Sequence, residues 1–247
     1  MLSTGSRSFI LLMLALGAGL IGFRQLAAGP AQYVLAVSWQ PAFCETRPRL
    51  PECRSQTEDR FDASHFSLHG LWPQPRSKAY CGVARTDIAK DKKRRWRDLS
   101  WERLDQVTWQ RLQQLMPGTR SGLHKHEWIK HGTCYDGTDA DEYFSDALLL
   151  MDALNTSDVQ KLFVTRIGRE LTTRDIRAAF DASFGPGAGD RVRVACKNDQ
   201  GRRLIVELTI GLSGTVSAAT AMSDLIAAAS ATEPGCPSGV VDAVGLQ

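Results

Sequence analysis

The stretch that decides the fold of this chain is HEWIKHGTC, which runs from His126 to Cys134. It holds two of the chain's 5 histidines, with a glutamate and a lysine between them. Residues three and four apart share one face of a helix, so a helix here turns both histidines, Glu127 and Lys130 toward one small volume. Four titratable groups in one place are costly as packing, and they suit chemistry on a charged substrate.

A second histidine segment, FSLHGLWPQ, runs from Phe66 to Gln74. His69 stands beside Gly70, whose missing side chain lets the backbone approach a ligand closely. Trp72 then offers a flat ring that suits stacking on a nucleobase. A buried tryptophan beside a core histidine is equally common, so this segment alone leaves packing and binding open.

Together, HGLWP at 69–73 and HEWIKHG at 126–132 resemble the two active-site segments of the ribonuclease T2 family, which are secreted enzymes that cleave RNA without a metal. The SWQP sequence at 38–41, with Cys44, is similar to the first strand of that family. The GTC sequence at 132–134 is similar to its disulfide attachment. The resemblance covers most of the chain and is greatest to the bacterial members, including the periplasmic ribonuclease I type.

The resemblance implies a role for each polar residue of the two segments. His131 matches the general base that takes the proton of the ribose 2′-hydroxyl, and His69 matches the general acid that protonates the leaving 5′-oxygen. Glu127 and Lys130 match the pair that stabilises the transition state, and His126 matches a phosphate-binding histidine. Imidazoles with pKa values of about 6.5 can divide acid and base roles. We therefore expect cleavage of single-stranded RNA through 2′,3′-cyclic phosphates to 3′-phosphates, with an acidic pH optimum.

The resemblance also implies residues that bind the bases. Trp72 matches an aromatic residue that stacks the base on the 5′ side, Tyr80 matches a second aromatic wall, and Gln40 matches a contact for the base on the 3′ side. Some members carry an acidic residue after Trp-Pro that reads a purine, whereas this chain has Gln74 there. This departure predicts broad base specificity. Ile129 stands where many members carry a second acid, and we expect it to lie off the catalytic face.

The 6 cysteines form an even set behind a signal-like N-terminus, which predicts three disulfides in an oxidising compartment. No CxxC pair occurs, which argues against a zinc ribbon or a thioredoxin-type site. Six cysteines allow about 15 connectivities, so the spacing alone does not choose among them. The resemblance to the family implies the pairs Cys44–Cys53, Cys81–Cys134 and Cys196–Cys236.

The N-terminus is typical of a secretory signal: Arg7, an apolar run over 9–23 and small residues around 27–31. The run is shorter than the roughly 20 residues of a membrane span, although Arg24 behind it leaves an uncleaved anchor open. We expect cleavage after Ala31, with Gly29 at the minus-three position. The chain then divides into a signal peptide (1–31) and one catalytic domain (32–247), periplasmic or extracellular, with no stable membrane association after signal removal.

The overall charge of the chain says little about its binding partner. The net charge of +3 becomes +1 when the two arginines of the signal are removed. The segment KDKKRRWR at 90–97 has 6 positive side chains and one negative, which suits a landing patch for nucleic acid. A solvated loop is the commoner meaning of such a run, and a membrane-facing patch is a further alternative.

Strand patterns near both ends, with helix patterns between them, predict a single α+β domain with a mainly antiparallel sheet and several packed helices. The 216 residues that remain after removal of 31 of the 247 are enough for one domain with a sizeable core. Strands are expected over 33–40, 65–72, 191–197, 203–212 and 240–244; helices over 101–116, 124–131, 141–155, 158–167 and 174–184; and loops over 41–52 and 74–100.

Two other classes of function compete with a ribonuclease. A metal-dependent hydrolase would use His124, His126 and His131, but the zincin pattern HExxH has Lys130 in place of its second histidine, and a lysine repels a cation. Activity that survives a chelator removes this class. A binding protein that has lost catalysis is excluded by turnover of RNA. The expected enzyme takes RNA as its partner and needs no metal, no cofactor and no obligate protein partner. Scavenging, defence and toxin roles fit the sequence equally.

Overall fold

The computed structural model describes residue 1 and residues 28–246, except residues 102 and 138. Most of the expected signal peptide, residues 2–27, lies outside the described residues. Within the described part, no helix is both long enough and apolar enough to cross a membrane.

A six-stranded sheet lies at the centre of the described chain, in the order β2-β1-β5-β6-β3, with β4 paired to β5. The β5–β6 pairing is parallel, and the β1–β2, β1–β5, β4–β5 and β3–β6 pairings are antiparallel. The predicted α+β class with a mainly antiparallel sheet is therefore confirmed. The strands are β1 (Tyr33–Ser38), β2 (Ser67–Pro73), β3 (Glu170–Thr172), β4 (Val192–Asp199), β5 (Arg202–Leu212) and β6 (Ser238–Val240).

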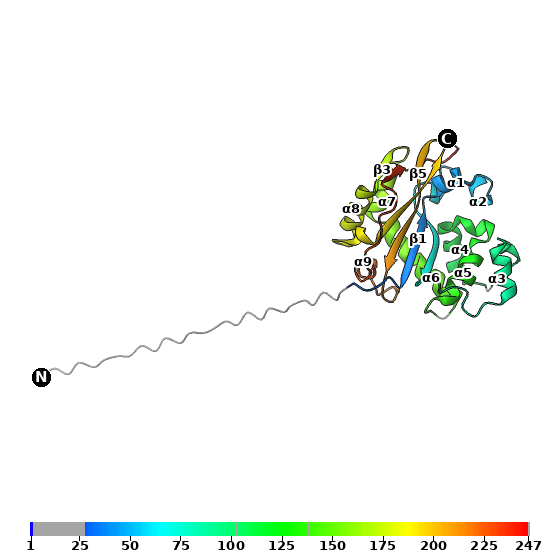
Figure 1. Ribbon diagram of the computed structural model, residues 1–247, viewed down its shortest axis with the longest axis horizontal. Helices are drawn as coiled ribbons and strands as arrows, with labels where there is room; N and C mark the ends of the chain where they lie inside the picture. Colours follow the sequence, from blue (N-terminus) through cyan, green and yellow to red (C-terminus); the bar gives the residue numbers. More distant parts are fainter. Residues whose placement is uncertain (2–27, 102, 138, 247) are drawn as a thin grey trace.

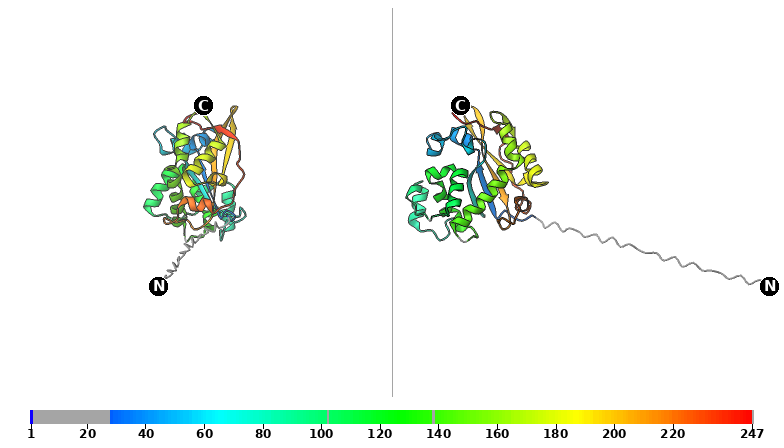
Figure 2. Two further views of the ribbon diagram at one scale, coloured as in Figure 1. Left: turned by 90° about the vertical axis from the view of Figure 1, so that its left-hand side faces the viewer. Right: turned by 180° about the vertical axis from the view of Figure 1, so that it is seen from behind.

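The sheet lies between two groups of helices (Figure 1), with α3, α4 and α5 on the side of β1 and β2 and with α7 and α8 on the opposite side. The view from behind shows the same two groups (Figure 2). The helices are α1 (Gln40–Glu45), α2 (Pro51–Arg54), α3 (Arg85–Lys92), α4 (Gln106–Leu115), α5 (Leu123–Lys130), α6 (Ala140–Asn155), α7 (Asp158–Thr165), α8 (Thr173–Phe184) and α9 (Met222–Ala227).

Helix α6 supplies the centre of the core. Its apolar side chains recur every three or four residues, and Phe144, Leu148 and Met151 are all buried. The Asp139 side chain caps the helix by accepting a hydrogen bond from the Glu142 N–H. Tyr143 is fully buried, and its hydroxyl donates to the Leu71 carbonyl of β2 at 2.9 Å. This bond fixes α6 against the strand that carries His69.

The structure differs from the sequence expectations mainly in the segments expected as loops. Helices α1 and α2 take up the two ends of 41–52 and leave a turn at 46–50, because Pro41 and Pro51 stand in the first turn of a helix, where proline is well tolerated. Helix α3 forms within 74–100. Helix α4 begins later than the expected residue 101, because the Asp105 carboxylate caps it. The last strand is also displaced, since β6 ends at Val240.

The folded body begins before Ala31. The Gly29 N–H donates to the Ala228 carbonyl at 3.0 Å, and the Ser230 N–H donates to the Gly29 carbonyl at 2.7 Å. Cleavage after Ala31 removes these bonds, whereas cleavage next to Ala28 keeps them.

Candidate active site

A bulge in strand β2 positions His69. Ala36 of β1 pairs with Gly70 and the next residue, Val37, pairs with Leu68, so His69 is the extra residue of the ladder. A bulge bends its strand and redirects a side chain. The His69 imidazole leaves the sheet and stands one-third exposed at the wall of a cleft.

A carboxylate from another strand holds the His69 ring. Glu207 Oε2 of β5 lies 2.5 Å from His69 Nδ1, and strand β1 runs between the two strands. Burial alone lowers the pKa of His69, but the hydrogen bond with Glu207 and the charges of Glu127 and Glu207 outweigh it, so the pKa lies above its ordinary value. His69 therefore stays protonated to a higher pH than a free histidine does.

Helix α5 comes so close to β2 at Gly70 that there is no room for a side chain at this position. A Cβ added to Gly70 would lie 2.0 Å from Glu127 Oε2. The space beside Gly70 is thus filled by Glu127, and the expectation that a ligand approaches the backbone there is replaced by a contact within the protein. Trp72 Nε1 donates to the same Glu127 oxygen at 2.8 Å, which orients the carboxylate.

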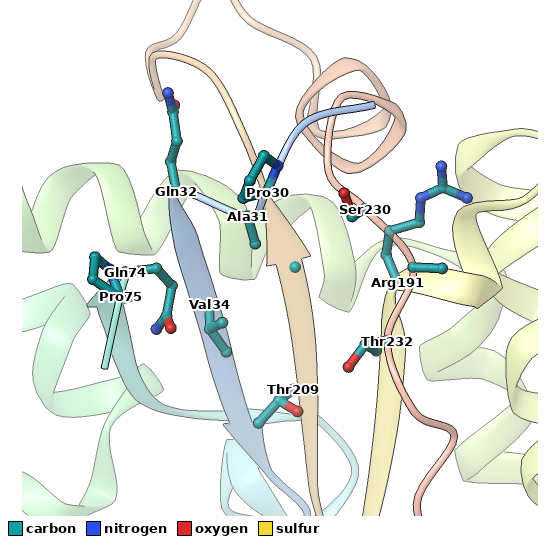
Figure 3. Close-up of a pocket in the computed structure, with 12 residues that line it drawn as sticks. Pro30, Ala31, Gln32, Val34, Gln74, Pro75, Arg191, Thr209, Ser230 and Thr232 are labelled. Atoms are coloured by element: carbon teal, nitrogen blue, oxygen red, sulfur yellow. The ribbon is translucent and has the colours of Figure 1, made fainter. Parts of the chain in front are cut away.

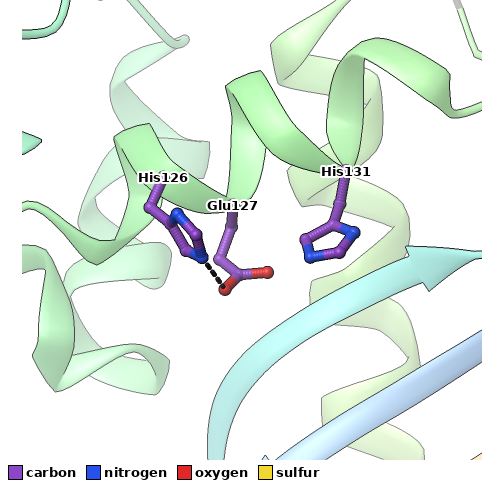
Figure 4. Close-up of side chains that lie close together, drawn as sticks. All are labelled: His126, Glu127 and His131. Atoms are coloured by element: carbon purple, nitrogen blue, oxygen red, sulfur yellow. Dashed lines mark ion pairs between the residues drawn. The ribbon is translucent and has the colours of Figure 1, made fainter. Parts of the chain in front are cut away.

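Glu127 lies between two imidazoles. Its Oε1 is 3.7 Å from His69 Nε2 and 3.7 Å from His126 Nε2, and only 1% of the side chain is exposed. Burial raises the pKa of Glu127, although both histidines, Trp72 and Lys130 oppose this. Figure 4 shows His126, Glu127 and His131 projecting from one side of the same helical segment. The arrangement collects positive donors around one buried carboxyl group.

Asp91, the single acid of the basic run, holds His126 and Tyr80. Asp91 Oδ1 lies 2.6 Å from His126 Nδ1, and the Tyr80 hydroxyl donates to Asp91 Oδ2 at 2.7 Å. Burial favours a raised pKa for Asp91, but the hydrogen bonds from His126 and Tyr80 and the charges of His126 and Lys130 lower the pKa overall. The Trp96 ring stacks on the His126 ring, with 4.8 Å between the ring centroids.

His131 has the opposite environment to His69. It caps the end of α5, 9% of it is exposed, and its ring lies 5.5 Å from the Trp72 ring. Burial, together with the positive charges of Lys130, His126 and His69, lowers the pKa of His131 to about 3. This imidazole is therefore neutral at any ordinary pH, and it can accept a proton.

A cleft of about 630 Å³ opens beside these groups. His69, Tyr80, His126 and Lys130 line it, whereas Trp72 and His131 do not. Its rim is basic, with Arg47 from the α1 side and Lys92 and Arg94 from the α3 side, which suits a polyanion.

The structure separates the residues expected to bind bases. Gln40 and Tyr80 line the cleft, and Tyr80 holds the unusual left-handed φ of 58°. Trp72 is half-buried, and its N–H is used on Glu127. Gln74 donates to the Trp72 carbonyl at 3.2 Å and lines a separate pocket of about 680 Å³ on the sheet (Figure 3). Gln74 therefore does not face the catalytic groups. Ile129 is buried.

The histidine set of a metal enzyme does not assemble as the alternative required. His124 is buried with its ring 4.7 Å from that of Trp101 and 5.1 Å from that of Trp109, and burial lowers its pKa to about 4. A smaller group remains, in which donor atoms of His126, Glu127 and His131 all lie within 4.8 Å of one another. The ammonium group of Lys130 acts on these same residues, and this positive charge disfavours a divalent cation.

Three disulfides join the pairs that the resemblance implied: Cys44–Cys53, Cys81–Cys134 and Cys196–Cys236. The Cys81–Cys134 bridge ties the segment before α3 to the end of α5. Beside it, the Tyr80 N–H donates to the Lys130 carbonyl at 2.9 Å. The bridge and this bond hold Tyr80 over the catalytic helix.

Two carboxylates of the site were not predicted from the sequence. One feature of the sequence could have pointed to Glu207, because it is an acid within the apolar strand sequence LIVELTIGL of β5. A weaker feature could have pointed to Asp91, which is the only acid among the six basic residues of 90–97. Neither signal names a partner, since both contacts join residues far apart in the chain.

Comparisons with a family model, with curated proteins and with solved structures all lead to ribonucleases. The family model described as Ribonuclease T2 family matches residues 31–224. Ribonuclease I of Escherichia coli (strain K12) is 30% identical over 200 residues, covering 72% of this chain and 74% of that protein. Ribonuclease 1 of Arabidopsis thaliana is 25% identical over 159 residues, covering 60% and 61%. The solved structure of ribonuclease MC1 from bitter gourd seeds has a TM-score of 0.51 at 19% identity, covering 73% of this chain and 89% of that chain, which shows a shared fold.

Proposed function

The chain belongs to the ribonuclease T2 family and is an endoribonuclease, and from this premise we propose how its site cleaves RNA. His69 acts as general acid and His131 as general base in a transesterification that uses the 2′-hydroxyl of the RNA itself. The nucleophile comes from the substrate, so the scheme needs no metal-bound water and no serine or cysteine of the protein.

One observation carries this proposal: the two imidazoles have environments that move their pKa values apart. Burial lowers the pKa of His69, but Glu207 and Glu127 outweigh it and raise the pKa above its ordinary value. At His131 burial acts together with the charges of Lys130 and the two other imidazoles and lowers the pKa to about 3. One ring is thus kept protonated while the other is kept neutral, and this division is what a concerted acid–base reaction requires.

In the first step, the 2′-oxygen forms a bond to phosphorus and the bond from phosphorus to the 5′-oxygen breaks. His131 takes the proton of the 2′-hydroxyl, and His69 gives a proton to the leaving 5′-oxygen. The products are a 2′,3′-cyclic phosphate and a free 5′-hydroxyl. Glu207 acts as a positioning residue, because it holds the proton-bearing His69 ring from the opposite nitrogen.

In the second step, water opens the cyclic phosphate and the two histidines exchange roles. His69, now neutral, takes a proton from water, and His131 returns its proton to the 2′-oxygen. The final product is a 3′-phosphate, and both histidines recover their starting states. This symmetry follows from microscopic reversibility of the proton transfers.

Lys130, Glu127 and His126 serve the phosphate between the two histidines. The Lys130 ammonium offsets the charge that develops on the non-bridging oxygens. Glu127 stabilises the positive charge of His69, and its Oε1 lies 3.7 Å from the Nε2 atoms of both His69 and His126. His126 is held by Asp91 at 2.6 Å, so its Nε2 is directed to the site and can donate to a phosphate oxygen.

We expect cleavage within many base sequences on the 5′ side of the scissile bond. Gln74, the position where an acid would read a purine, lies in another pocket. Aromatic stacking on Trp72 or Tyr80 accepts any base, because every base has a π-face.

The enzyme is proposed to act in the periplasm or outside the cell. The signal-like sequence and the three disulfides support this location, because disulfides persist in oxidising compartments. RNA is the one partner that the proposal requires.

Product analysis tests the reaction. In a time course on a short single-stranded RNA followed by phosphorus NMR, 2′,3′-cyclic phosphate ends should accumulate first and 3′-phosphate ends should replace them. Products with 5′-phosphate ends would rule out attack by the 2′-hydroxyl.

A further inference from the structure

Glu52 is a buried carboxyl group that the scheme above does not use, although it lines the same cleft as His69 and Lys130. Only 2% of the residue is exposed. Its Oε1 accepts a hydrogen bond from the Ser121 hydroxyl at 3.0 Å, and its Oε2 has no hydrogen-bond partner among the described residues. A buried acceptor without a partner is destabilising, so a donor from the substrate would remove this penalty.

A disulfide and a backbone hydrogen bond hold the segment that carries Glu52. Helix α2 is tied to α1 by the Cys44–Cys53 disulfide next to Glu52, and Arg60 Nη1 donates to the Glu52 backbone carbonyl at 2.9 Å. The lining of the cleft that contains Glu52 includes the charged side chain of Arg47 and several apolar and neutral side chains, namely Gln40, Phe43, Leu50, Ser121 and Leu123. Apolar walls with one aromatic ring and one buried acceptor are the usual components of a site for an unstacked base.

The position of His69 decides which nucleotide enters this end of the cleft. His69 lines the cleft and His131 does not. In the proposed scheme His69 protonates the leaving 5′-oxygen, so the nucleotide that carries this oxygen lies on the His69 side. We therefore place the base on the 3′ side of the scissile phosphate beside Glu52, which leaves Tyr80, in the lining of the same cleft, for the base on the 5′ side.

The chemistry of a carboxyl group then selects among the bases. A carboxylate only accepts hydrogen bonds. Guanine offers two adjacent donors, N1–H and the N2 amino group, whereas adenine and cytosine place a ring acceptor beside their amino group. Uracil has one N–H between two carbonyl oxygens. The Gln40 amide, which is buried in the same wall, can donate to guanine O6.

We propose that Glu52 is a specificity-determining residue that reads the base 3′ to the scissile phosphate and favours guanine there. The inference rests on the proposed function, since it needs RNA cleavage and the role of His69. It adds a preference on the 3′ side to the broad specificity expected on the 5′ side.

Dinucleoside monophosphates with a constant 5′ uridine test this proposal: UpG, UpA, UpC, UpU and the inosine analogue UpI. For the wild-type enzyme, kcat/KM should be highest for UpG. It should be lower for UpI, which keeps N1–H but lacks the N2 amino group, and lowest for UpA, UpC and UpU. In Glu52→Gln, kcat/KM for UpG should fall by about tenfold or more, as expected for a lost hydrogen bond to a charged group, and UpU should change by less than about twofold.

Asp146→Asn is the matched control, because Asp146 is a buried carboxylate that accepts from the Tyr135 hydroxyl at 2.6 Å and does not line the cleft. Its order of substrates should equal that of the wild type. Equal values of kcat/KM for UpG, UpI and UpA in the wild type would overturn the proposal. This test uses no variant, so it stands even if Glu52→Gln folds poorly. Equal loss on all substrates in a folded Glu52→Gln also overturns it. If the wild type cleaves none of the substrates, the proposed function itself fails.

Discussion

Glu207 and His69 are the residue pair on which the proposed division of acid and base roles depends. The Glu207 carboxylate raises the pKa of His69, and a raised pKa keeps the acid protonated at higher pH. When the carboxylate is replaced by an amide, the pKa of His69 should fall. In Glu207→Gln the basic limb of the kcat/KM profile should therefore move to lower pH, by about one unit.

Glu170→Gln is the control for this measurement, because Glu170 is an exposed glutamate on another strand of the same sheet. Its basic limb should coincide with that of the wild type. A basic limb that stays in place or moves upward in Glu207→Gln would show that Glu207 does not set the protonation of the general acid.

Trp72 combines two roles that substitutions can separate. Its ring is available for stacking on a base, and its N–H donates to buried Glu127 at 2.8 Å. Trp72→Phe keeps a ring and loses the N–H, so kcat should fall while KM for single-stranded RNA changes little. Trp72→Ala loses both, and binding should weaken by roughly 1–3 kcal/mol in addition. Steady-state kinetics and melting temperatures of both variants provide the measurement. Unchanged affinity in both, with much lower melting temperatures, would assign Trp72 to packing alone.

At the scale of a single element, helix α3 and the turn after it supply basic side chains to the cleft. Lys92 and Arg94 line the cleft, whereas their neighbours Lys93 and Arg95 do not. If the first pair contacts phosphates, its neutralisation should weaken RNA binding and reduce the dependence of log Kd on log salt by about 0.7 per contact, or about 1.4 in all. Binding of a single-stranded RNA across a salt series, in a His131→Ala background that blocks cleavage, measures this slope.

The variant Lys93→Gln with Arg95→Gln has the same change in net charge and serves as the matched control. Its slope should change less than that of Lys92→Gln with Arg94→Gln. Equal slopes for the two double variants would mean that the segment acts only through its overall charge.

At the scale of the whole molecule, the N-terminal boundary contributes to stability. Gly29 pairs with the segment at 228–230 through hydrogen bonds of 3.0 and 2.7 Å. A chain that begins at Gly29 should therefore be more stable to urea than one that begins at Gln32, by roughly 1–3 kcal/mol for the lost bonds. Urea unfolding of the two chains checks this, and identical midpoints and slopes would place the boundary of the folded body after Ala31.

The sequence predicted those parts of the molecule that depend on neighbours in the chain. The HGLWP and HEWIKHG segments could be identified because their residues act from consecutive positions. The strands and helices of the centre could be identified from their apolar periods. Pro41 and Pro51 were misleading, because they stand in the first turns of helices rather than in a loop.

The remaining features depend on contacts between distant segments, and no local pattern contains them. Glu207 lies on β5 and His69 on β2, with β1 between the two strands. The bulge in β2 turns the His69 imidazole so that it reaches the Glu207 carboxylate. Asp91 reaches His126 only because α3 packs near α5. Gly70 was attributed to a ligand, although its neighbour is Glu127 of another element.

The central claim is that His69 and His131 drive attack by the 2′-hydroxyl of the RNA without a metal. The most direct test compares cleavage, in excess EDTA, of a natural single-stranded RNA and of the same RNA with methylated 2′-hydroxyls. The natural strand should be cut at its normal rate and the methylated strand should stay intact, because its 2′-oxygen has no proton to give to His131. Equal cleavage of both strands, or loss of all activity in EDTA, would contradict the account.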